Sequence, residues 1–188
     1  MDYVSIAISA CLGIGLSASA GFRVFIPLLL LSIAGYTGWV PLNSDWAWAG
    51  SLTAVIVLAV AAVVEVGAYY IPVVDNFLDS IMAPLATIAG TAVVVAVVGD
   101  LDPVYTWALA IIAGGGTAAT VATTTSAARL TSTATTGGIG NPIVSTAEAG
   151  FSGILAVLAL VWPFLAIIVV IILLLLVRKL YKTVFKKV

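Results

Sequence analysis

Long apolar runs, separated by short polar segments, make up almost all of the 188-residue chain. Plain membrane helices are predicted at 51–69 and 82–98. The last run, 151–177, can span a bilayer once with tilt, or split at Trp162-Pro163 into two shorter pieces. The polar segments fall at 37–50, 71–80 and 99–103. The pattern predicts an all-α, polytopic membrane helix bundle with five or six crossings.

Two further runs, 4–36 and 104–136, are too long for one straight crossing. Each has about 33 residues, and a helix of that length is about 50 Å long, against a hydrocarbon core of roughly 30 Å. We therefore expect both helices to be broken, discontinuous or re-entrant. The candidate breaks are Gly13–Gly15, Ala20-Gly21 and Pro27 in the first run, and Gly114–Gly116 in the second. The first run is either a discontinuous helix, or a helix over 3–20 that turns near Arg23 into a re-entrant piece over 24–35.

Small or hydroxylated residues recur every fourth position in both long runs. The two series are Ser5, Ser9, Gly13, Ser17, Gly21 and Gly116, Thr120, Thr124, Ala128, Ser132, Thr136. Residues at this spacing share one helix face, and small faces let helix backbones approach closely in lipid. We expect the two runs to pack on each other inside the remaining helices, with Gly13, Gly21, Gly116 and Thr120 as packing positions.

The composition agrees with this architecture. The chain is 63% hydrophobic and 8% charged, whereas a soluble domain has roughly 25% charged residues. We therefore expect residues 1–188 to form one transmembrane domain whose main partner is the lipid bilayer, with no nucleic acid. Residues 178–188 carry five basic side chains, and the positive-inside rule places this tail on the cytoplasmic side of the cell membrane.

The same composition excludes several kinds of chemistry. The chain has no His and one cysteine, Cys11, so the usual nitrogen and sulfur ligands of transition metals are missing. Ser-His and Cys-His catalytic pairs are also excluded. We expect no metal, no cofactor and no enzymatic activity, and we interpret Cys11 as a small packing residue.

Four ionisable residues stand out within the apolar runs. Arg23 and Arg129 each cost about 2.5–3.5 kcal/mol at the bilayer centre unless they have partners. They either form a site for an anion or lipid headgroup, or lie at helix ends and extend to the interface. Glu65 and Glu148 are the acids expected to face them. These acids either form structural salt bridges or couple the protein to protons or cations.

Hydroxyl groups cover every side of the predicted helix around Thr124 and Thr125. Such hydroxyls can bond carbonyls one turn earlier, and close packing explains one hydroxylated face. Hydroxyls on the other faces suggest a water-filled side. The predicted substrate path is therefore lined by Arg23, Arg129, Glu65, Glu148, Ser17, Ser19, Thr124 and Thr125.

Two parts of the chain, about 1–100 and 104–180, resemble each other loosely. Gly15–Arg23 matches Gly114–Ala122 in small-residue content, and PVVD at 72–75 matches PIVS at 142–145. An acid, Asp79 or Glu148, follows each of these prolines by six or seven residues. Such repeats are typical of transporter and channel folds, and we expect an inverted repeat. Asp75 and Asp79 are expected to cap a helix at 76–83 or to face water.

Four segments together resemble the uncharacterised membrane family called domain of unknown function 4126. They are GLSASAGFRVFIPLL, IPVVDNFLD, GGGTAAT with the later AAR, and GNPIVSTAE, and the resemblance covers roughly residues 12–170. In that family the second long run often carries a His and a Lys ahead of its Arg; those places hold Ala122 and Thr125 or Ser126 here. The resemblance implies a polytopic membrane protein and no particular reaction.

Two hypotheses of function follow. In the first, the protein is a small transporter or channel for a small anionic solute or lipid headgroup, bound at Arg129 and Arg23, with Glu65 and Glu148 balancing charge. In the second, it is a non-transporting scaffold or partner subunit packed through its small-residue faces, which could also join copies of the chain.

Overall fold

The computed structural model describes residues 3–99 and 101–185, and this part of the chain is all-α. The end of the basic tail, 186–188, and Asp100 of the predicted 99–103 turn lie outside the described residues. The elements are α1 (Tyr3–Phe22), α2 (Phe25–Tyr36), the 3₁₀ segment η1 (Ser44–Gly50), α3 (Leu52–Ala68), α4 (Pro72–Val97), α5 (Pro103–Leu109), the π-helical segment η2 (Ala110–Gly115), α6 (Gly116–Thr136), α7 (Asn141–Val161) and α8 (Pro163–Phe185).

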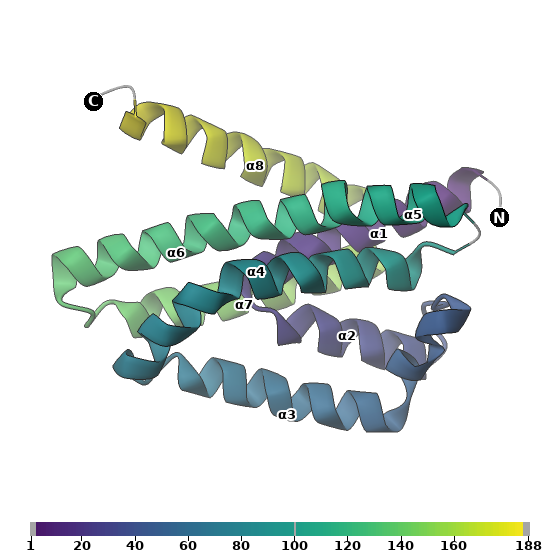
Figure 1. Ribbon diagram of the computed structural model, residues 1–188, viewed down its shortest axis with the longest axis horizontal. Coiled ribbons are helices and arrows are strands. Elements are labelled where there is room, and N and C mark those ends of the chain that lie inside the picture. The colour runs from purple at the N-terminus through teal and green to yellow at the C-terminus, as the bar shows by residue number, and fades with distance from the viewer. Residues whose placement is uncertain (1–2, 100, 186–188) are drawn as a thin grey trace.

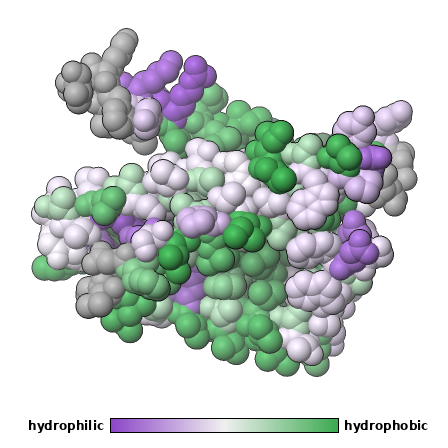
Figure 2. Space-filling model, viewed as in Figure 1, coloured by the Kyte–Doolittle hydropathy of each residue, from purple (hydrophilic) through white to green (hydrophobic). Residues whose placement is uncertain are grey.

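The helices have the length and apolar character of membrane spans. In the described part, four are long and apolar enough to cross a bilayer, and η1 with α3, bent by 63°, gives a fifth if the pair is one span. The four are Tyr3–Phe22, Phe77–Val97, Pro103–Thr136 and Asn141–Val161. Hydrophobic residues cover much of the face in Figure 2, and hydrophilic ones gather mainly toward its ends. The chain is a multi-pass membrane protein, as its composition predicts.

Helix α1 is the centre of the bundle. Its residues from Leu12 to Gly21 are buried except Ile14, and it contacts α4, α6, α7 and α8. The long helices run along one axis, with α3 and α8 on opposite sides (Figure 1). The start of α1 lies at the same end as the end of α4, whereas the α6–α7 turn and the end of α8 lie at the other end (Figure 1).

The first long run forms two helices that meet at Arg23 and Val24. Pro27 explains the position of the turn, because a proline ring clashes with the carbonyl four residues earlier, here that of Arg23. That carbonyl instead accepts a 3.4 Å hydrogen bond from the Ser152 hydroxyl. Helix α2 then returns toward the end of the molecule where α1 begins (Figure 1).

The second long run is not broken at its glycines, and that expectation is wrong. Residues Pro103–Thr136 form one continuous span, in which Gly114 and Gly115 belong to the π-helical segment η2. The glycines serve close packing, because a Cβ built at Gly114 would lie 2.6 Å from the carbonyl oxygen of Gly90 in α4. The irregularity here is a local change of helical pitch.

The face of α6 that packs inward differs from the predicted one. Gly116 and Thr120 are exposed, and a Cβ at Gly116 would meet open space, so neither is a packing position. The buried residues of this helix are Thr117, Ala118, Val121, Ala122 and Arg129. On α1 the expected positions are buried: a Cβ at Gly21 would lie 2.5 Å from Val121 Cβ in α6, and one at Gly13 would lie 3.1 Å from side-chain atoms of α4.

The start of α4 differs from the sequence-based expectation, whereas the start of α8 agrees with one of the two alternatives. The polar segment 71–80 is helical, because α4 begins at Pro72 rather than at Met82. Proline suits the first turn of a helix, where its missing N–H would have no partner. The last apolar run splits at Trp162-Pro163 into α7 and α8, which is one of the two alternatives that its sequence allows.

The loose repeat pairs α1 with α6 and α4 with α7. In Figure 1, α1 and α6 run in the same direction, and so do α4 and α7. Segments related by an inverted repeat run in opposite directions. The parallel directions of these helix pairs therefore give no support to the expected inverted repeat.

Candidate functional site: a buried arginine–carboxylate cluster

Arg129 of α6 joins three carboxylates of α4 and α7. Its Nε donates to Glu148 Oε1 at 3.1 Å, and its Nη2 donates to Glu148 Oε2. Its Nη1 donates to Asp75 Oδ1 at 2.5 Å and lies 3.6 Å from Asp79 Oδ1. Arg129 is 2% exposed and Asp75 1%. Arg129 is therefore paired with acids inside the protein rather than exposed at its surface.

Arg23, at the end of α1, reaches the same glutamate. Its Nη2 lies 3.1 Å from Glu148 Oε2 and donates to Ser145 Oγ at 2.6 Å and to the Ser145 carbonyl at 3.1 Å. The residue is fully buried, yet its Nε and Nη1 have no hydrogen-bond partner. Buried polar groups are nearly always hydrogen-bonded, so two unpaired donors on one guanidinium call for an explanation.

Both guanidinium groups also lie over the ring of Tyr69, which follows α3. The Cζ atoms of Arg23 and Arg129 are 3.7 and 4.0 Å from the ring centroid, as in cation–π contacts. Burial raises the pKa of the Tyr69 phenol above its usual value. The phenol therefore stays neutral at physiological pH.

Asn141, the first residue of α7, completes the contacts around Asp75. Its Nδ2 donates to Asp75 Oδ2 at 2.8 Å and to Thr133 Oγ1 at 2.9 Å, while its buried Oδ1 has no partner. We call this site the arginine cluster; its members are Arg23, Tyr69, Asp75, Asp79, Arg129, Asn141, Ser145 and Glu148. It holds two basic and three acidic side chains, so it has a formal charge of −1 when all are ionised.

Glu65 of α3 contacts backbone N–H groups rather than an arginine. Its carboxylate accepts hydrogen bonds from the backbone N–H groups of Val24 at 2.8 Å and Phe25 at 3.0 Å. These are otherwise unpaired donors at the start of α2, where a negative charge also interacts favourably with the helix dipole. Glu65 therefore fixes the turn that holds Arg23 in place and forms no salt bridge in the described residues.

One protein family matches this chain. The sequence profile described as Domain of unknown function (DUF4126) matches residues 10–183. The chain belongs to this family. No curated protein and no solved structure matches it.

The DUF4126 match spans every member of the arginine cluster and confirms the resemblance found in the sequence. The family's description assigns no activity. Among the described residues, no group of three or more His, Cys, Asp or Glu side chains is placed to hold a metal ion.

The hydroxyl side chains of the predicted path lie outside the arginine cluster. Ser17 bonds the carbonyls of Gly13 and Gly90, and Ser19 bonds Ser152 of α7, so both join helices in the core. Thr124 and Thr125 are half-buried and donate to carbonyls of their own helix at 2.7 and 2.9 Å. Among the hydrogen bonds of the described residues, none joins these four side chains to either guanidinium group.

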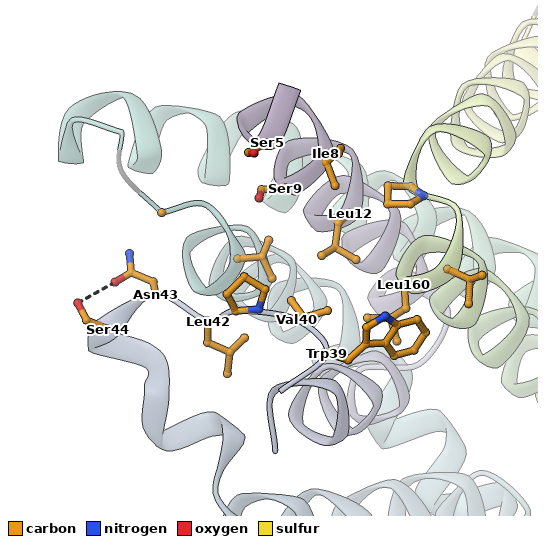
Figure 3. A pocket seen from close by; sticks show the side chains of 15 residues that line it. Ser5, Ile8, Ser9, Leu12, Trp39, Val40, Leu42, Asn43, Ser44 and Leu160 are labelled. Carbon is orange, nitrogen blue, oxygen red and sulfur yellow. Dashed lines mark hydrogen bonds between the residues drawn. The ribbon is translucent and has the colours of Figure 1, made fainter. Parts of the chain in front are cut away.

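A pocket of about 780 Å³ opens at the other end of the molecule (Figure 3). The start of α1 contributes Ser5, Ser9 and Leu12, and the segment after α2 contributes residues 39–44. The end of α4 and the α7–α8 junction complete its lining. No member of the arginine cluster lines this pocket, and buried α1 residues from Leu16 to Gly21 lie between the two.

Sequence reasoning missed five members of the cluster: Tyr69, Asp75, Asp79, Asn141 and Ser145. The expectation that Asp75 caps a helix or faces water is wrong, because it is buried against Arg129. A signal for two of them was present in the PVVD and PIVS match. Asp75 and Ser145 occupy equivalent places in it, and each bonds one of the two arginines.

Proposed function

We propose that this protein is a small membrane transporter whose solute site is the arginine cluster, and that the solute is a small anion, free or as a lipid headgroup. The observation that carries the proposal is that two buried guanidinium groups converge on one carboxylate oxygen, Glu148 Oε2. An arginine guanidinium can donate two parallel hydrogen bonds to one anion, and this fork-like geometry is a common means of binding carboxylates and phosphates. Arg23, Arg129 and Glu148 are the residues that we propose to act on the solute.

The closed packing of α1 favours a carrier over an open channel. The pocket of Figure 3 and the arginine cluster lie toward opposite ends of the bundle, and the α1 residues between them are buried. A solute could reach the cluster from the pocket only if helices moved. We propose that α2, whose start is held by Glu65, and α1 form a re-entrant pair with Arg23 at its tip, and that this pair moves during transport.

We propose that the C-terminal end of α8 lies in the cytoplasm, because of its basic residues. The α6–α7 turn lies at the same end of the molecule (Figure 1). The arginine cluster would then face the cytoplasmic side, and the 780 Å³ pocket would be the outer entrance.

Flux into proteoliposomes tests this proposal. Purified protein would be reconstituted and assayed for uptake of chloride, phosphate, formate and acetate, with sodium and potassium as cation controls. We expect one or more anions to enter faster than into protein-free vesicles. Arg129→Lys keeps the charge but loses the fork, so we expect it to fold and to lower the flux by about tenfold or more. Folded wild-type protein that moves none of these anions would contradict the proposal.

A scaffold without transport is the second candidate. It is favoured by the threonine hydroxyls of α6, which bond their own helix, and by the tight glycine contacts between α1, α4 and η2. In that case the arginine cluster would serve only to lock α1, α4, α6 and α7 together. Under both candidates we propose that the protein is not an enzyme.

A further inference from the structure

We propose that the solute class is a small carboxylate, which enters the arginine cluster by exchanging with the side chain of Glu148. This inference rests on the proposed function and specifies it. Nε and Nη2 of Arg129 engage the two oxygens of Glu148 side by side. This arrangement fits a planar group with two oxygens, and Glu148 already occupies it as a carboxylate tethered to the chain.

The spare donors of Arg23 point to a ligand beyond Glu148. A guanidinium has five N–H donors, and in Arg23 only Nη2 is used, whereas Nε and Nη1 are buried without partners. Glu148 cannot satisfy them while it is bound by Arg129. A free carboxylate that took the place of Glu148 could turn toward both arginines and use these donors.

The surroundings of the site limit the size of this solute. Arg23 is fully buried and Arg129 is 2% exposed, and Glu148 is 5% exposed. Packing this close leaves little more room than the carboxylate it encloses. Formate and acetate match that group in shape, whereas chloride is a single atom without oxygens and phosphate is bulkier.

The exchange requires a proton as well as a carboxylate. Glu148 pairs with Arg23 at the end of α1 and with Arg129 of α6. The other titratable groups at the site are Tyr69 after α3 and Asp75 and Asp79 of α4, which contact these arginines, and Glu65 of α3, which binds the start of α2 beside Arg23. Once the incoming carboxylate pairs with the arginines, Glu148 is left beside two aspartates in a poorly hydrated place. A carboxylate there is stabilised by protonation. Its oxygen gains a proton from water at the open side of the carrier, so one proton accompanies each bound anion.

The inference is tested by measuring whether small carboxylates restore the stability of a Glu148→Ala variant. The measurement uses the full-length protein in detergent. Glu148→Ala removes the tethered carboxylate and leaves a space of its size. We expect formate or acetate to raise the thermal stability of this variant in a saturable way, with an apparent affinity about tenfold or more above that of the wild type, because the tethered competitor is gone. Chloride at equal ionic strength should do much less. Glu148→Gln fills the same space, so we expect formate and acetate not to raise the thermal stability of that variant.

A second measurement applies if the Glu148→Ala variant does not fold in the presence of any of these anions. Wild-type protein mixed with formate in weak buffer should take up protons in proportion to the formate bound, and Glu148→Gln should not. Equal stabilisation by chloride, or formate binding without proton uptake, would overturn the inference. If the wild type transports chloride or phosphate and ignores carboxylates, only this inference fails; if it transports no anion, the proposed function fails with it.

Discussion

The positive charges of two buried arginines in an apolar bundle need acidic or polar partners, and the surrounding residues provide them. Arg129 is matched by Asp75 and Glu148, and Arg23 by Glu148, Ser145 and the ring of Tyr69. Removing one member of a buried ion pair typically costs about 3–5 kcal/mol, because the remaining charge stays buried. For the two arginines, charge-preserving changes such as Arg129→Lys are therefore more informative than truncation to alanine.

Glu65 provides a test of one residue's role. We expect Glu65→Ala to destabilise the protein by about 1–3 kcal/mol, because the N–H groups of Val24 and Phe25 lose their acceptor. Glu65→Gln keeps one acceptor oxygen and should cost less. Thermal unfolding in detergent measures both.

The same pair of variants separates capping from proton coupling. If Glu65 only caps α2, Glu65→Gln should transport within about twofold of the wild type, since a change this small is under about 0.5 kcal/mol. A folded Glu65→Gln protein with no flux would show instead that Glu65 takes part in transport.

At the scale of helices, the sequence predicts more reliably which segments contact each other than which helix faces make the contact. The contact of α1 with α6 follows from their small residues, and Gly21 lies against Val121 as the α1 series suggests. The inward face of α6 could not be predicted, because small residues recur every fourth position on two of its faces, at 114, 118, 122 and at 116, 120, 124. Only the neighbouring helix decides between these faces.

Two glycine substitutions test this packing. A methyl group at Gly21 would lie 2.5 Å from Val121 Cβ and 2.7 Å from the Ala118 carbonyl oxygen, so Gly21→Ala should destabilise the protein by about 1–3 kcal/mol. Gly116→Ala is the matched control, because its methyl group would meet open space. It should stabilise α6 by up to about 1 kcal/mol. Thermal unfolding that ranks the two variants the other way would contradict the assigned faces.

For the whole molecule, composition and run lengths are enough to predict an all-α multi-pass membrane protein. They also predict that the run over 4–36 cannot be one straight span, since Pro27 removes a backbone hydrogen bond. They do not predict the arginine cluster as a whole, because its members come from the ends of α1 and α3 and from α4, α6 and α7. Residues so far apart in the sequence meet only through packing.

The closed state of the bundle also determines what transport requires. A site enclosed by α1, α4, α6 and α7 can bind a soluble anion only if it opens to water, first on one side of the membrane and then on the other. A scaffold has no such requirement. Water access to the arginine cluster therefore separates the two proposed functions without knowledge of the solute.

The most direct measurement is the labelling of a thiol placed in the cluster. In a Cys11→Ala background, Ser145→Cys puts a thiol beside Arg23 Nη2, at a position that is 1% exposed in this state. Membrane vesicles of both orientations would be treated with a membrane-impermeant thiol reagent. We predict labelling from both faces, because the cluster opens alternately to each. A folded protein that is labelled from neither face, but fully after denaturation, would contradict a transport role for the cluster.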